Sequence, residues 1–141
     1  MKFKDIIRAT KALWYHGCYV ALDGRANSVT ISKGLYRHMM ATERDSMLLI
    51  VFRSGGNYCF AFRDDFEQLK SANTVFVELQ YNTEHDKIGF RTDNPSVTGI
   101  LASYNMPMDR LVKLSVLPCK TKAGETFYEI QRPAAHKKTR L

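Results

Sequence analysis

The stretch Ser28–Asp64, SVTISKGLYRHMMATERDSMLLIVFRSGGNYCFAFRD, carries the signals that decide the fold. Its β-branched run at Val29–Ile31 predicts a short strand. Ser32 follows as a suitable N-cap, so we expect a helix over Lys33–Ala41, in which apolar residues recur at i, i+4 spacing. This strand and helix lead into the second half of the stretch.

That second half contains the clearest hairpin signal of the chain. Apolar and aromatic residues over Met47–Arg53 and Asn57–Arg63 flank Ser54-Gly55-Gly56-Asn57, whose glycines suit a tight turn. Both faces of the first strand are apolar, which is typical of a central strand covered on both sides. Tyr58, Phe60 and Phe62 alternate along the second strand and therefore share one face. That face could belong to the core or lie exposed to solvent.

Outside this stretch, periodicity and turn residues predict the remaining elements. Amphipathic spacing predicts a helix over Lys2–Tyr15, ended by Gly17. A short helix with an acidic start is expected at Asp64–Ala72, and Asn94-Pro95 predicts the start of a helix that runs to about Tyr104. Strands are expected at Cys18–Leu22, Thr74–Tyr81, Lys87–Arg91, Leu111–Leu117 and Thr126–Gln131.

Together these elements predict an α+β fold with antiparallel β hairpins and three to four short helices. The order strand, helix, hairpin occurs twice, over Val29–Arg63 and Lys87–Gln131, which is one argument for an internal duplication. Residue identity between the two halves is poor, which argues against it. We expect one domain over residues 1–131, followed by a basic tail over residues 132–141.

The positive charge of the chain is the main global indication of its partners. Twenty-one Lys and Arg against fourteen Asp and Glu give a formal net charge of +7, which favours association with polyanions. Four basic residues without an acid lie in the last ten positions: Arg132, Lys137, Lys138 and Arg140. This tail is either a solvated terminus or an electrostatic arm for nucleic acid.

Other features predict the compartment. Met1–Tyr15 mixes Lys, Arg and Asp with its apolar residues, so we expect no signal peptide, and the longest apolar run is too short to span a membrane. Cys18, Cys59 and Cys119 are odd in number and lie in apolar segments, which predicts three free, mostly buried thiols. A cytoplasmic protein is the expectation.

No motif predicts catalysis, a metal or a cofactor. None of the four histidines pairs with another His or with a Cys at metal-ligand spacing. His85 lies in a polar turn beside Glu84 and Asp86 and could in principle work with them, but neither standard phosphate-binding glycine loop occurs and Ser54 has no nucleophile-elbow context. We therefore expect a protein that is not an enzyme.

One part of the chain resembles the swapped-hairpin AbrB/MazE type of transition-state regulator and antitoxin. The resemblance rests on Asp23-Gly24-Arg25, Val29–Ser32, Leu35, Arg37, Met39, Asp45 and the alternation of Met47, Leu49 and Val51, about 40 of 141 residues. Members of that family are dimers whose arginines and lysines enter the DNA major groove. The resemblance implies that Arg25, Lys33 and Arg37 contact nucleic acid.

A second resemblance uses the same hairpin. Gly56–Phe62 is similar to the ribonucleoprotein octamer of RNA-recognition motifs, and the surrounding β-α-β-β-α-β order resembles theirs. Exposed aromatic residues on that strand stack on bases in such domains. This resemblance implies a stacking face at Tyr58, Phe60 and Phe62, provided that these side chains face solvent.

We therefore expect a non-enzymatic, nucleic-acid-binding regulator, with DNA favoured over RNA, that forms a homo-oligomer, most simply a homodimer. The expected contacts are Arg25, Lys33 and Arg37, with Arg132, Lys137, Lys138 and Arg140 as an electrostatic arm. The alternative is a protein–protein interaction or assembly module, such as a phage-type accessory subunit, in which apolar strands pair between chains. No metal or membrane is expected.

Overall fold

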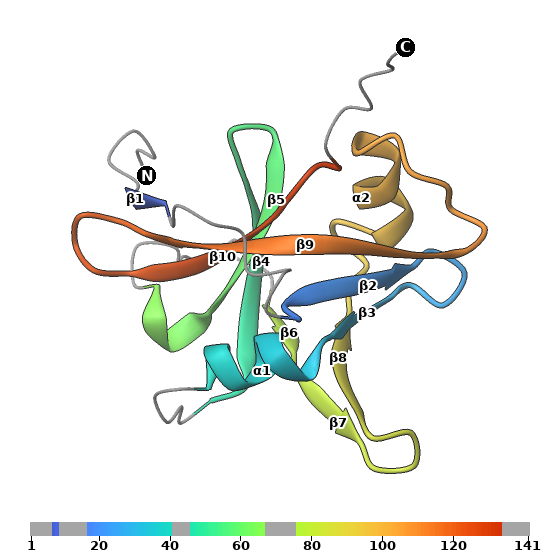
Figure 1. Cartoon of the computed structure of the whole chain (residues 1–141), viewed down its shortest axis with the longest axis horizontal. Helices are drawn as coiled ribbons and strands as arrows, with labels where there is room; N and C mark the ends of the chain where they lie inside the picture. Colours follow the sequence, from blue (N-terminus) through green and yellow to red (C-terminus); the bar gives the residue numbers. More distant parts are fainter. Residues whose placement is uncertain (1–6, 9–16, 41–45, 67–75, 134–141) are drawn as a thin grey trace.

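A computed structural model of the chain describes residues 7–8, 17–40, 46–66 and 76–133. Two α-helices and ten β-strands occur within these ranges, and the strands wrap around a common core (Figure 1). In chain order the elements are β1 (Ile7–Arg8), β2 (Tyr19–Asp23), β3 (Ser28–Ile31), α1 (Lys33–Met39), β4 (Leu48–Ser54), β5 (Asn57–Phe62), a 3-10 turn (Arg63–Asp65), β6 (Phe76–Glu78), β7 (Gln80–Asn82), β8 (Lys87–Arg91), α2 (Val97–Ser103), β9 (Leu111–Lys120) and β10 (Thr126–Ile130).

The strands form one antiparallel sheet that curls into a nearly closed barrel. Their order is β6-β4-β5-β10-β9-β2-β3-β8-β7, with β1 paired to β9. The two edge strands, β6 and β7, are consecutive in the chain and are separated by Leu79 alone. Leu79 donates its backbone N–H to the Met47 carbonyl oxygen at 2.9 Å. The segment 76–82 therefore pairs with β4 at one end and with β8 at the other, which closes the circuit.

The strand pairing follows the same scheme in both halves of the chain. In each half a hairpin is followed by a helix and a second hairpin: β2, β3, α1, β4 and β5, and then β6–β7, β8, α2, β9 and β10. The first hairpin of each half pairs with the second hairpin of the other half, because β2 pairs with β9 and β6 pairs with β4. The remaining contacts join equivalent strands, β3 with β8 and β5 with β10. The two halves of one chain thus exchange hairpins, because each half pairs its first hairpin with the second hairpin of the other half.

The expectation of an α+β fold with three to four helices is wrong. The structure is mainly antiparallel sheet, and the described residues contain two α-helices. Ile7 and Arg8, which lie in the predicted helix over Lys2–Tyr15, pair with β9 as a strand, and the rest of that helix lies outside the described residues. The start of the predicted helix over Asp64–Ala72 is a 3-10 turn at Arg63–Asp65, and residues 67–72 lie outside the described residues.

The central stretch folds as predicted, whereas the second helix starts later. α1 begins after Ser32, and the hairpin of β4 and β5 turns at Gly55 and Gly56, both with positive φ. α2 begins at Val97 and not at Pro95, because the N-cap is Ser96. The Ser96 hydroxyl accepts the Gly99 backbone N–H at 3.1 Å, as an N-cap serine does.

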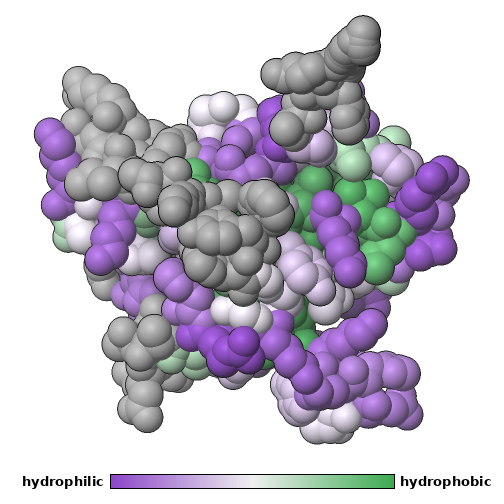
Figure 2. Space-filling view, viewed as in Figure 1, coloured by the Kyte–Doolittle hydropathy of each residue, from purple (hydrophilic) through white to green (hydrophobic). Residues whose placement is uncertain are grey.

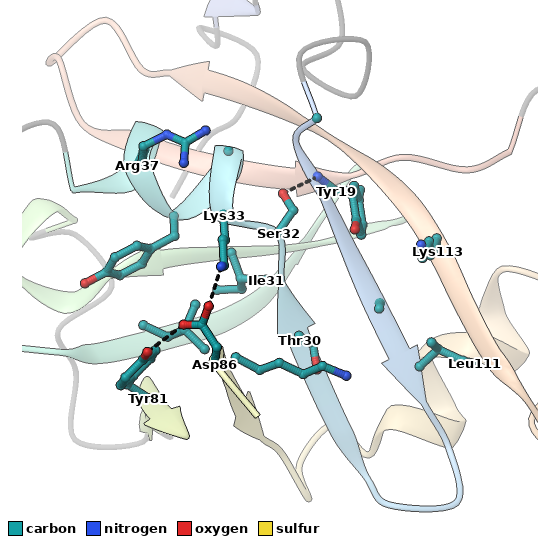
Figure 3. A pocket seen from close by; sticks show the side chains of 16 residues that line it. Tyr19, Thr30, Ile31, Ser32, Lys33, Arg37, Tyr81, Asp86, Leu111 and Lys113 are labelled. Carbon is teal, nitrogen blue, oxygen red and sulfur yellow. Dashed lines mark hydrogen bonds and ion pairs between the residues drawn. The ribbon is translucent and has the colours of Figure 1, made fainter. Parts of the chain in front are cut away.

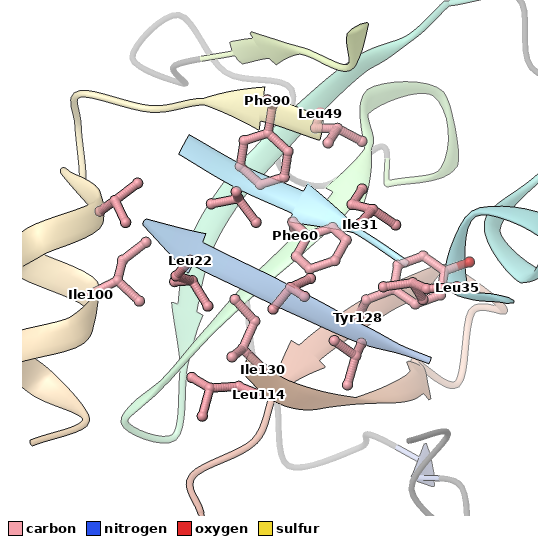
Figure 4. Close-up of a cluster of buried hydrophobic side chains, with 14 of the residues drawn as sticks. Leu22, Ile31, Leu35, Leu49, Phe60, Phe90, Ile100, Leu114, Tyr128 and Ile130 are labelled. Carbon is pink, nitrogen blue, oxygen red and sulfur yellow. The ribbon is translucent and has the colours of Figure 1, made fainter. Parts of the chain in front are cut away.

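The barrel interior holds the larger hydrophobic core. Phe60 and Phe62 are fully buried, and Phe60 packs between Phe90 and Tyr128, with ring centroids 5.9 and 5.7 Å away (Figure 4). These phenylalanines are therefore core residues, and the base-stacking role that the RNA-recognition resemblance implies for them is not available in this fold. The half-buried Tyr58 packs on Tyr104.

Tyr104 of the α2 C-cap ties the two exchanged halves together. Its hydroxyl accepts the Tyr58 backbone N–H at 2.8 Å and donates to the Ile130 carbonyl oxygen at 2.6 Å. The register of β5 and β10 pairs Phe60 with Tyr128. Two residues further along, the same register would place Tyr58 opposite Ile130. The hydroxyl thus bridges two strands where their direct ladder ends.

Candidate nucleic-acid interface

Two of the predicted contact residues, Lys33 and Arg37, lie on α1. The helix starts there because the Ser32 hydroxyl accepts the Leu35 backbone N–H at 3.2 Å. The same hydroxyl accepts the Tyr19 backbone N–H at 3.0 Å, which fixes the start of α1 against β2 (Figure 3). Lys33 and Arg37 are one helical turn apart and both exposed, so their side chains rise from neighbouring positions on the surface.

A hollow of about 790 Å³ opens beside α1, and we call it the α1 groove. It is bounded by α1, β2, β3, the β7–β8 hairpin and β9. One acidic side chain lines it, Asp86. The basic side chains that line it are four: Lys33, Arg37, Lys87 and Lys113. In Figure 3, Lys33 and Lys113 lie on either side of β2 and β3. Residues far apart in the sequence therefore form one basic surface.

A second hollow, of about 640 Å³, continues from the α1 groove over β8, and we call it the β8 groove. Four residues line both hollows and therefore lie at their junction: Thr30, Tyr81, Lys87 and Ile88. His85 and Arg91 line the β8 groove but not the α1 groove. The basic surface thus extends along β8 beyond α1.

A cluster of three side chains joins α1 to the β7–β8 hairpin. The Asp86 carboxylate accepts a hydrogen bond from the Lys33 ammonium with one oxygen. With its other oxygen it accepts the Tyr81 hydroxyl at 2.5 Å (Figure 3). Exposed ion pairs of this kind contribute little to stability, so the main effect of the cluster is to orient the three side chains.

The same contacts fix the charges of the cluster. The hydrogen bond from Lys33, followed by that from Tyr81, lowers the pKa of Asp86. Its hydrogen bond to Asp86 raises the pKa of Lys33, and the corresponding bond raises the pKa of Tyr81. At neutral pH Asp86 is therefore an anion, Lys33 a cation and Tyr81 a neutral hydrogen-bond donor.

The remaining predicted contact residues lie elsewhere. Arg25 is in the β2–β3 turn, at the other end of β3 from α1, where its guanidinium is held by Asp23 at 3.0 and 3.2 Å. Arg132 is docked on the barrel: it donates to the carbonyl oxygens of Gly56 and Ser103, both at 2.8 Å, and its guanidinium lies over the Tyr104 ring. Lys137, Lys138 and Arg140 lie outside the described residues.

Sequence reasoning missed four residues of the interface: Tyr81, Asp86, Lys87 and Lys113. The alternation along β9 carries a signal, since Val112 and Leu114 are buried and Lys113 between them is exposed. That alternation predicts an outward-facing lysine but not its neighbours. Only the pairing of β9 with β2, and of β8 with β3, brings Lys113 and Lys87 to α1.

The described residues offer little for other chemistry. Among them, no group of three or more His, Cys, Asp and Glu side chains could hold a metal ion. The predicted polar turn places His85 against Glu84 at 3.2 Å, where both side chains are well exposed. Cys18, Cys59 and Cys119 are buried and form no disulfide, as predicted. Neither described helix has the length and apolar character needed to cross a membrane.

Comparison of the chain with protein-family models, with curated proteins and with solved structures finds no match. The functional argument therefore rests on the geometry of the interface itself.

Proposed function

We propose that this protein binds nucleic acid through the α1 groove, as a non-enzymatic regulator, with DNA favoured over RNA. The observation that carries the proposal is the convergence of Lys33, Arg37, Lys87 and Lys113 on one hollow. Like charges from α1, β8 and β9 repel one another, and Asp86 pairs with Lys33 alone, so a bound anion would offset the remaining repulsion. A phosphate backbone supplies regularly spaced anions, and the net charge of +7 favours its approach.

The strand pairing adds support for a DNA-binding role. The two halves of the chain exchange hairpins, which is the kind of arrangement that the resemblance to swapped-hairpin regulators implies. Those proteins bind DNA as dimers. Here one chain closes the barrel, so a homodimer remains a proposal that the fold does not require.

The test is charge reversal in the groove. We expect Lys33→Glu with Arg37→Glu to abolish binding of a fluorescently labelled DNA oligonucleotide in an anisotropy titration at low salt. The thermal melt should change little, because both side chains are exposed. A matched control makes the same change of charge outside the groove: Arg110→Glu with Lys122→Glu, both on exposed turns.

The control separates local contacts from net charge. If both double variants lose binding equally, the effect is one of overall charge and the groove is not the site. If neither the wild type nor the control binds DNA or RNA at low salt, the proposed function is wrong.

A specific observation also favours the alternative of a protein–protein assembly module. Met108 and Leu111 expose 47% and 49% of their surfaces, respectively. Hydrophobic residues gather on the visible face where β2 and β9 approach α2 (Figure 2). An assembly interface on this area would be insensitive to salt, whereas phosphate binding weakens steeply as salt rises.

A further inference from the structure

Tyr81, the aromatic residue at the junction of the two hollows, bears on whether the nucleic acid is a single strand or a duplex. Tyr81 lies on β7, lines both the α1 groove and the β8 groove, and exposes 57% of its surface. It is one of three large hydrophobic side chains exposed among the described residues. Its position places an exposed ring in the middle of the basic surface.

The Tyr81 ring is also held in place. Its hydroxyl donates to Asp86 at 2.5 Å, and Asp86 is in turn bound by Lys33 (Figure 3). Asp86 lies in the turn between β7 and β8 with a positive φ of 50°. A ring anchored at its hydroxyl loses little conformational entropy when a flat ligand stacks on it.

Two other rings line the α1 groove, and both are less exposed than Tyr81: Tyr36 is partly buried against the core, and Tyr19 is partly buried on β2. The Lys113 ammonium lies 5.0 Å from the centroid of the Tyr19 ring, a cation–π contact that covers one face of that ring. A base would have to displace Lys113 to stack there. Tyr81 is therefore the better stacking surface, with Lys33 beside it in the α1 groove and Lys87 in both hollows.

The shape of the surface also bears on the choice between single and double strands. Proteins read duplex DNA by inserting a protruding helix or β-ribbon into the major groove. Here the basic side chains line hollows, and α1 is only seven residues long. A basic groove combined with an exposed aromatic ring is typical of sites that bind single strands, where bases are free to stack.

We propose that the α1 and β8 grooves bind single-stranded nucleic acid, with the backbone along the basic side chains and one base stacked on Tyr81. This inference rests on the proposed function and specifies its ligand. Base stacking is indifferent to the sugar, so single-stranded DNA and RNA are both candidates, and the experiment includes each. Asp86 acts as a positioning residue for the ring.

The experiment compares variants of the full chain on four labelled probes: oligo-dT, oligo-U, and a DNA and an RNA duplex of the same length. We expect tighter binding of one or both single strands than of either duplex. Tyr81→Leu should weaken binding of the single strand about tenfold, since stacking on one base contributes about 1–3 kcal/mol. Duplex binding should change less than twofold.

Two further variants distinguish the ring from its anchor and from general apolar surface. Tyr81→Phe keeps the ring and removes the hydrogen bond to Asp86, so its loss should be smaller than that of Tyr81→Leu. Met108→Ala removes an exposed apolar side chain outside both hollows and should leave the affinity unchanged. Photo-crosslinking with 5-iodouracil in the oligonucleotide should label Tyr81.

The outcomes separate this inference from the proposed function. Preference for duplex, or an unchanged single-strand affinity in folded Tyr81→Leu, would overturn the inference while leaving the groove as a nucleic-acid site. A crosslink that maps only outside both hollows would overturn it as well. Binding of no probe by the wild type would refute the proposed function itself.

Discussion

Replacing Tyr104 by phenylalanine should weaken the barrel where β5 meets β10. The change removes one oxygen atom and leaves the Tyr58 N–H and the Ile130 carbonyl oxygen without the hydroxyl that joins them. An unsatisfied buried backbone group costs about 1–3 kcal/mol. The Ile130 bond is buried and the Tyr58 bond is partly buried, so we expect the free energy of unfolding to fall by about 2–4 kcal/mol.

Urea denaturation followed by circular dichroism measures this loss. For a chain of this size the corresponding decrease in Tm is about 3 °C per kcal/mol, or roughly 10 °C in total. Tyr58→Phe is the matched control, since it removes a hydroxyl from the half-buried ring that packs on Tyr104. A loss below about 1 kcal/mol for Tyr104→Phe, or one equal to that of the control, would refute the bridging role.

Two substitutions and one labelling experiment also test the fold. A Cβ on Gly89 would lie 2.2 Å from the Val29 carbonyl oxygen, so Gly89→Ala should separate β8 from β3 and lower Tm strongly; a Tm near that of the wild type would contradict the pairing. Although His38 is exposed, partial burial of its ring beside Tyr128 lowers its pKa, so the unfolded chain takes up its proton first as pH falls below about 6.5. Stability should therefore fall between pH 7 and 5, and urea titrations should show a smaller fall in His38→Gln. The three buried thiols should react slowly with Ellman's reagent in the native state and all at once in urea; fast native labelling would contradict their burial.

Local signals predicted α1 and most of the strands, but they also predicted helices that the described part of the chain lacks and did not predict how the strands assemble. Ser32, the Gly55-Gly56 turn and the alternation of β9 act through nearest neighbours, so they are readable from a short window of sequence. The barrel depends on contacts between β2 and β9 and between β5 and β10, which lie about half a chain or more apart. Nothing in the local pattern of either strand specifies its distant partner, so an expectation built from separate hairpins missed the closure.

The candidate interface follows the same division. Lys33 and Arg37 were predicted as contacts from the resemblance to swapped-hairpin regulators, and the helix places them one turn apart. Lys87 and Lys113 belong to the same groove, but only strand pairing brings them there. Arg132 shows the opposite case: its position in a basic tail predicted a free arm, whereas the structure has it bound to the β4–β5 turn and to Ser103.

The salt dependence of binding tests the central claim most directly. Four phosphate contacts in the α1 groove predict that the logarithm of the association constant falls with the logarithm of salt concentration with a slope of about −3 for a single strand. The neutral variant Lys33→Gln with Arg37→Gln removes two of these contacts without adding acidic groups, so weak binding should stay measurable with about half of that slope. An affinity that does not change with salt, or a slope that is the same in both proteins, would contradict phosphate binding in the α1 groove.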